Sequence, residues 1–173
     1  GLSSSHFNAT SGTTTLDGTP ISWSLSADTN DLTIESSETP QSGEVVHIDD
    51  ESLVDGSITN YGTIWSTENN AIAFDNTTIT GTFNIYNNDS ESVIESDSKN
   101  PDEAAILIKD TTGTINITNA GTITSSTYGI LNKGSTINSF INSGTLETTG
   151  EWSTSLDIGS LYNDEASTIT SLT

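Results

Sequence analysis

Short runs in which apolar and polar residues alternate recur along the chain, and three of them end in an Asn that is followed one residue later by a Gly-Thr pair. The clearest run is residues 113–123 (GTINITNAGTI), and related runs occupy residues 57–64 and 139–146. A degenerate copy occupies residues 81–88. Alternation with a period of two is the pattern of a β-strand with one buried face. Each copy therefore predicts a short strand, a corner and a second short strand.

The spacing of the copies predicts how they are arranged. The corner residues Asn60, Asn87, Asn119 and Asn142 are 27, 32 and 23 residues apart. A repeat of this length is too short to fold alone and is typical of a solenoid, whose neighbouring coils stack about 4.8 Å apart. A third strand, of the Ala-Ile-Ala-Phe type seen at residues 71–74, fits each repeat. We expect an all-β fold, a right-handed parallel β-helix with three strands per turn.

The corner Asn and Gly residues are expected to be structural. Asn tolerates the left-handed backbone region, and its amide can bond the main chain of its own and the next coil. Gly allows a change of direction without a Cβ clash. The predicted corner ladder comprises Asn60, Asn87, Asn119, Asn142, Gly62, Gly121 and Gly144. Alternation along the same strands predicts that Ile58, Ile64, Ile85, Ile117, Ile123, Ile141 and Leu146 point inward.

Residues 1–31 do not carry the repeat. Residues 13–16, an Asp-Gly turn signal and the alternating residues 21–25 predict a hairpin. Because a solenoid must cover the open end of its core, we expect this segment to be an N-terminal cap with Trp23 as its plug. Residues 32–173 are expected to form the repeats. Since the chain ends on half a repeat, we expect the array to continue in a longer parent protein.

The net charge of the chain limits the classes of binding partner that we expect. It has 24 acidic residues against three Lys and no Arg, for a formal net charge of −21. Nucleic acids and anionic membrane surfaces are bound through Lys and Arg, so neither is an expected partner. No apolar run approaches the length needed to cross a bilayer, and we expect no direct membrane insertion. A protein or a glycan remains the expected partner.

The repeated Ile-x-Asn-x-Gly-Thr-Ile phrase, as in residues 58–64, resembles passenger domains of Gram-negative autotransporters and related large adhesins. The resemblance extends over residues 32–173. It implies export through the outer membrane, a right-handed parallel β-helix, and a secreted or cell-surface location in a virulence-related protein. The absence of cysteine agrees with that route.

Two functions from different classes are open, and a purely structural stalk is a third possibility. The first is a non-enzymatic adhesin segment that mediates adhesion or cell–cell association by binding a protein or glycan on a host or sibling cell, or another copy of itself. The second is a carbohydrate-active β-helix, such as a glycosidase or tailspike, that uses a carboxylate pair. A lyase is disfavoured because the chain has no Arg and its three Lys lie apart. A serine hydrolase is also disfavoured, since His6 lies in the tail and His47 alternates with apolar neighbours.

Acidic clusters are the candidate metal ligands, and they suit Ca²⁺, which prefers carboxylate oxygens. A zinc site built from His and Cys is not expected, and neither is any other cofactor. The densest cluster comprises Asp49, Asp50, Glu51 and Asp55. Weaker candidates are Asp89 with Glu91, and Asp97 with Asp102 and Glu103 in the polar segment 95–103, which predicts a protruding loop. None matches a known calcium-loop pattern, so a solvated acidic turn is the alternative interpretation.

Three aromatic residues are candidate ligand contacts. If Ile64 points inward, Trp65 points outward, and the same holds for Tyr86 beside Ile85. Tyr61 follows the first corner Asn. Outward aromatic rings on adjacent coils suit a carbohydrate or protein contact, and the alternative is that loops fold over them.

Overall fold

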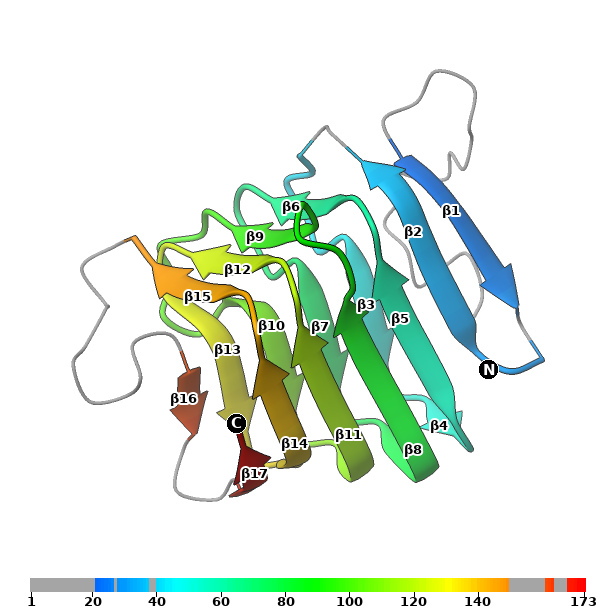
Figure 1. Ribbon diagram of the computed structural model, residues 1–173. Helices are drawn as coiled ribbons and strands as arrows, with labels where there is room; N and C mark the ends of the chain where they lie inside the picture. The colour runs from blue at the N-terminus through cyan, green and yellow to red at the C-terminus, as the bar shows by residue number, and fades with distance from the viewer. Residues whose placement is uncertain (1–20, 27, 38–39, 150–160, 164–167) are drawn as a thin grey trace.

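The computed structural model describes residues 21–26, 28–37, 40–149, 161–163 and 168–173. These residues form seventeen β-strands and no helix, which confirms the all-β class (Figure 1). Within this part of the chain, therefore, no helix offers the length and apolar character that crossing a bilayer requires.

The strands belong to three sheets. The eight-stranded sheet contains β1 (Ile21–Ser26), β2 (Asp31–Ser37), β4 (Ser52–Leu53), β5 (Gly56–Asn60), β8 (Thr78–Asn87), β11 (Thr112–Asn119), β14 (Thr136–Asn142) and β17 (Thr168–Leu172). The five-stranded sheet contains β3 (Val46–Asp49), β7 (Ile72–Asp75), β10 (Ala104–Lys109), β13 (Tyr128–Lys133) and β16 (Leu161–Asn163). The four-stranded sheet contains β6 (Thr63–Ser66), β9 (Val93–Ser96), β12 (Thr122–Ser125) and β15 (Thr145–Thr148).

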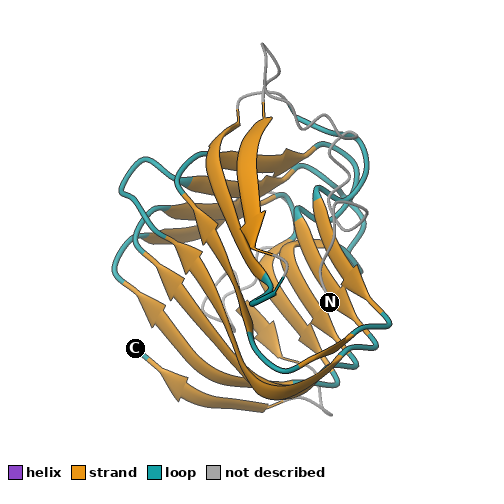
Figure 2. Ribbon diagram, turned by 90° about the vertical axis from the view of Figure 1, so that its right-hand side faces the viewer, coloured by secondary structure: helices purple, strands orange, loops and turns teal. Residues whose placement is uncertain are grey.

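From β3 onward the chain visits the five-, eight- and four-stranded sheets in a fixed cyclic order, and we call one such circuit a pass. Strands inside a sheet pair in parallel with the equivalent strands of the passes before and after them; β8, for example, lies between β5 and β11. Seen from the β1–β2 end, the three sheets lie on three sides of the interior (Figure 2). Sequence neighbours therefore lie in different sheets, and sheet neighbours lie one pass apart in sequence.

Rows of aliphatic and aromatic side chains, one from each pass, fill the interior. Ile58, Ile85, Ile117 and Phe140 occupy equivalent positions on β5, β8, β11 and β14, and each is at most 2% exposed. Fully burying one such side chain is worth about 1.5–3 kcal/mol. The repeated apolar position two residues before each corner Asn thus contributes one buried row to the core.

The expectation that Ile141 points inward is wrong. Its side chain is 46% exposed, whereas Phe140 is 2% exposed. The register pairs Phe140 with Ile117 and pairs Ile141 with Thr118. The buried position lies two residues before the corner Asn, and Ile141 lies only one residue before Asn142, so it takes the opposite face. Leu146, on β15 at one end of the four-stranded sheet, is partly buried against the core.

The N-terminal strands pair differently from the expected hairpin. β1 pairs antiparallel with β2, a segment that the pattern had assigned to the first repeat. β2 also pairs in parallel with β5, and Leu32 lies opposite Ile58. It therefore belongs to both the antiparallel pair and the parallel array. Residues 13–16 and the side chain of Trp23 lie outside the described part, so those expectations are not tested.

The middle strands of the five-stranded sheet, β7, β10 and β13, carry buried apolar residues on both faces, which the sequence analysis did not anticipate. Ile72 and Phe74 on β7 face the interior, while Ala73 between them is 1% exposed on the opposite face. Leu107 and Leu131 occupy the equivalent positions on β10 and β13 and are also buried. The sequence of a parallel strand that is buried on both faces is a continuous apolar run and does not alternate between apolar and polar residues.

Candidate functional site

The corner Asn residues form a continuous hydrogen-bonded ladder. Nδ2 of Asn60 donates to Oδ1 of Asn87 at 3.0 Å, and Nδ2 of Asn87 donates to Oδ1 of Asn119 at 2.9 Å. Nδ2 of Asn119 continues the ladder to Oδ1 of Asn142 at 2.9 Å. The first three are at most 1% exposed, so the ladder satisfies buried amides and carries no chemistry open to a ligand.

The glycines that follow Asn60 and Asn119 are hydrogen-bonded to the same ladder. The amide of Gly62 donates to Oδ1 of Asn60 at 3.0 Å, and the amide of Gly121 donates to Oδ1 of Asn119 at 3.2 Å. A Cβ on Gly121 would lie 2.2 Å from a backbone oxygen of the previous pass, and one on Gly144 would lie 2.1 Å from the oxygen of Gly121. The corners at Gly121 and Gly144 therefore require glycine, because successive passes touch there.

Two further buried polar corners escaped the sequence analysis. At the end of the four-stranded sheet, Ser66 and Ser96 pair across passes, and their hydroxyls donate to the carbonyls of Gly43 at 2.8 Å and Asn69 at 2.6 Å. After the five-stranded sheet, the hydroxyl of Thr77 donates to the Ile48 carbonyl at 3.0 Å. Small hydroxyl side chains therefore satisfy backbone groups at the corners where Asn does not.

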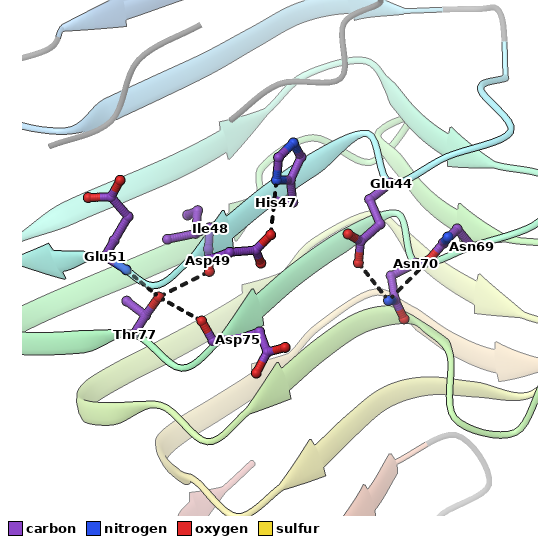
Figure 3. Close-up of polar contacts among 9 residues, drawn as sticks. All are labelled: Glu44, His47, Ile48, Asp49, Glu51, Asn69, Asn70, Asp75 and Thr77. Atoms are coloured by element: carbon purple, nitrogen blue, oxygen red, sulfur yellow. Dashed lines mark hydrogen bonds and ion pairs between the residues drawn. The ribbon is translucent and has the colours of Figure 1, made fainter. Parts of the chain in front are cut away.

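The four predicted calcium ligands do not come together. Oδ1 of Asp50 accepts a hydrogen bond from Nδ2 of Asn76 at 2.7 Å, and Oδ1 of Asp55 accepts one from the amide of Thr82 at 2.8 Å. Asp50 has a φ of 55°, which turns the chain away from β3. In the described ranges, the one group of three or more potential metal ligands is instead Glu44, His47 and Asp49 (Figure 3).

The weaker acidic candidates are engaged separately. Oδ1 of Asp89 accepts hydrogen bonds within its own turn, from the hydroxyl of Ser90 at 3.3 Å and the amide of Glu91 at 3.4 Å. Asp102 lies 3.3 Å from the ammonium of Lys133. Glu103 accepts a hydrogen bond from the Ser98 hydroxyl at 2.6 Å.

The three aromatic candidates are not gathered on one surface. Tyr61 follows β5 at the corner and is 47% exposed. Trp65 lies on β6 in the four-stranded sheet, and its Nε1 donates to Oδ2 of Asp97 at 2.7 Å. Tyr86 lies on β8 in the eight-stranded sheet, between Thr59 and Thr118 of the adjacent passes. Trp65 and Tyr86 are on adjacent passes but on different sheets.

An open surface pocket lies where the four-stranded sheet connects to the five-stranded sheet. Its volume is about 420 Å³. Two loops of adjacent passes contribute its lining residues, which are Thr67, Glu68, Asp97, Ser98, Lys99, Asn100 and Glu103. The predicted loop at 95–103 supplies most of them, although β9 continues to Ser96 and the loop begins only at Asp97.

The longer loop is braced by its own side chains. The hydroxyl of Ser98 donates to Glu103 and accepts from the amide of Asn100 at 3.1 Å. The amide of Glu103 donates to the Asn100 carbonyl at 3.0 Å. At the start of the loop, the Asp97 amide donates to the carbonyl of Ser66 at 2.9 Å. The pocket is therefore preformed rather than dependent on a ligand to order its wall.

A carboxyl pair lies beside this pocket. Glu95 on β9 is hydrogen-bonded to Asp97, which also accepts the Trp65 indole hydrogen bond. The pKa of Glu95 is raised to about 7, first by burial and then by the hydrogen bond and negative charge of Asp97. At neutral pH this pair therefore retains a proton for part of the time. Its position is fixed by Trp65, which lies opposite Glu95 in the register of β6 and β9 and donates to Asp97.

Comparisons with protein-family models, with curated proteins and with solved structures found no match to this chain. The geometry of its own residues is therefore what indicates its function.

Proposed function

We propose that the protein is a right-handed parallel β-helix. The fixed cyclic order of the three sheets, the parallel pairing of successive passes and the inner Asn ladder support this architecture. Right-handedness follows from the strong preference of parallel crossover connections for that hand. The antiparallel strand β1 would serve as the N-terminal capping hairpin with β2, because it continues the eight-stranded sheet beyond the first parallel pair.

We further propose that it is a non-enzymatic adhesive segment that binds glycans on a cell surface. The observation that carries the proposal is the preformed polar pocket beside Trp65. Its volume of about 420 Å³ lies within the usual range of about 300–1,000 Å³ for small-molecule sites. Carboxylate, amide and hydroxyl groups line it, and these are hydrogen-bonding partners for sugar hydroxyls. A half-buried indole next to it supplies an apolar surface for a sugar ring.

The charge of the pocket defines the class of glycan. Glu68, Asp97 and Glu103 outnumber the single cation Lys99 in its lining. Such a wall repels uronates and sialylated sugars and favours neutral or amino sugars. An extracellular, bacterial cell-surface location is part of the proposal and is supported by the resemblance of the repeat phrase to autotransporter passenger domains.

The test is direct binding of the intact chain to an array of neutral, amino and acidic glycans. We expect binding of a neutral or amino sugar, and a loss of at least about tenfold in affinity on Asp97→Asn, which removes a lining carboxylate. Glu91→Gln is the matched control, because it removes an exposed acid that does not line the pocket. Failure to bind any glycan, or equal losses in both variants, would contradict the proposal.

The raised pKa of Glu95 favours a second candidate, a carbohydrate-active enzyme with Glu95 as general acid and Asp97 as its partner. The spacing argues against it. Glu95 and Asp97 are close enough to share a hydrogen bond, whereas glycosidases hold their two carboxyl groups about 5 Å or more apart. Release of reducing sugar from an oligosaccharide, abolished by Glu95→Gln, would establish the enzyme; glycan binding without product supports the adhesive role.

A further inference from the structure

Three ligand-type side chains meet on the outer face of the five-stranded sheet, and none of them lines the pocket. His47 and Asp49 are two residues apart on β3, so both project from the face opposite the buried Val46 and Ile48. Glu44 precedes the strand, and its carboxylate turns toward the same face (Figure 3). One ligand atom from each of the three lies within 4.8 Å of the other two.

The separation of these atoms suits a first-row metal ion. Nδ1 of His47 and Oδ2 of Asp49 are 3.3 Å apart. An ion about 2.1 Å from both atoms would subtend an angle of roughly 100°, close to the tetrahedral value. In an ideal tetrahedron of that size the ligand atoms are about 3.4 Å apart. A small shift of the Glu44 carboxylate toward the other two ligands, with its bond to Asn70 kept, therefore completes the set.

The third ligand is held in place by a buried amide. Oε2 of Glu44 accepts a hydrogen bond from Nδ2 of Asn70 at 2.9 Å, and Oδ1 of Asn70 accepts one from the amide of Ala104 at 2.8 Å. Asn70 is 4% exposed, and its orientation is fixed by the bond to Ala104. Partners of this kind orient metal ligands and commonly change affinity by about 10- to 100-fold.

The donor chemistry selects the ion. Two carboxylates with one imidazole suit Zn²⁺ and its neighbours, whereas Ca²⁺ and Mg²⁺ prefer sets made only of oxygen. Asp75 lies beside Asp49 on the adjacent strand and adds negative charge that favours a cation. We propose that Glu44, His47 and Asp49 form a binding site for a divalent first-row transition metal ion, with Zn²⁺ as the preferred ion and water completing its coordination.

Isothermal titration of the intact chain with ZnCl₂ at neutral pH tests this site. We expect one saturable ion per chain and a loss of affinity of at least about tenfold in His47→Gln, Glu44→Gln and Asp49→Asn. The matched control is Asp50→Asn, which makes the same chemical change at the next residue, outside the ligand set, and keeps an amide that tolerates its positive φ. Its affinity should stay within about twofold of the parent chain.

NMR spectroscopy of the His47 ring distinguishes Zn²⁺ binding at this site from binding elsewhere on the chain. The chain has two histidines, so the imidazole resonances in a ¹⁵N NMR spectrum are assigned by one substitution, His6→Gln. Zn²⁺ should shift the His47 ring, and an excess of Ca²⁺ should leave it unchanged. Circular dichroism without metal verifies that each variant is folded. The proposal is overturned by the absence of saturable Zn²⁺ binding, by equal losses in Asp49→Asn and Asp50→Asn, or by retained affinity in His47→Gln.

Discussion

Nδ2 of Asn87 donates to Oδ1 of Asn119 at 2.9 Å, although the two residues are 32 positions apart in the chain. Asn119 also accepts from the amide of Gly121 and donates to the carbonyl of Thr145 at 2.9 Å. One side chain thus joins three successive passes. The ladder therefore links successive passes and also satisfies the buried polar groups at the corners.

Asn119→Ala should lower the free energy of unfolding by roughly 2–3 kcal/mol, because buried donors and an acceptor lose their partner. Urea denaturation monitored by circular dichroism measures this loss. Asn138→Ala is the control: its amide donates to Oδ1 of Asn116 at 2.8 Å, but on the exposed face. It should cost less than about 1 kcal/mol. Similar losses at the two positions would show that the inner ladder has no special role.

Phe140→Ala and Ile141→Ala should differ sharply although the residues are neighbours. Phe140 lies in the buried row, and its truncation should cost about 3–5 kcal/mol. Ile141 is 46% exposed, and its truncation should cost less than about 1 kcal/mol. Chemical denaturation of both variants measures the two losses. A reversed order would mean that β14 pairs in the other register.

Glu95→Gln should flatten the pH dependence of stability. The pKa of Glu95 is raised from 4.5 to about 7 in the folded chain. The folded state thus binds the proton more tightly than the unfolded state does. The stabilisation from protonated Glu95 is complete below pH 4.5 and is lost as pH rises through about 7.

Thermal unfolding of the parent chain and of Glu95→Gln across this pH range measures the effect. The variant should gain stability relative to the parent as pH rises, since Gln has no charge to bury. Glu91→Gln, which changes an exposed residue, should follow the parent curve. A parent curve that rises with pH in step with the variant would place the Glu95 pKa below neutrality.

Asp102→Asn should change stability little, although it removes an ion pair. Asp102 and Lys133 are 3.3 Å apart, but the Asp102 side chain is 75% exposed. Exposed ion pairs contribute about 0–1 kcal/mol and are screened by salt. Denaturation at low and high salt measures the contribution. A loss well above this range, or one that persists in high salt, would indicate that the pair braces the pocket loop.

The strands and the Asn corners were predictable from the sequence because each carries a local signal. The positions of Asn60, Asn119 and Asn142 stand out, since an Asn shortly before Gly-Thr is distinctive even in a Ser- and Thr-rich chain. The hydroxyl corners at Ser66 and Thr77 give no such signal, because the same residue types occupy many exposed positions. The inward assignment of Ile141 was wrong because the buried position lies two residues before the corner Asn, and Phe140 occupies that position.

The candidate site depended on relations that sequence order does not contain. Adjacency suggested Asp49 with Asp50, but the positive φ of Asp50 separates them and leaves Asp49 beside His47. The contact between Trp65 and Asp97 spans 32 residues and follows only from the register of β6 with β9. Neither relation is visible until the passes are aligned.

The connection from the four-stranded to the five-stranded sheet occupies residues 67–71 in one pass, 97–103 in the next and only 126–127 in the third. The Asn ladder remains in register through all three. Loop length at this edge is thus decoupled from the geometry of the scaffold. Evolution or a protein engineer can lengthen, shorten or exchange the segments that recognise a ligand while the supporting framework keeps its pitch.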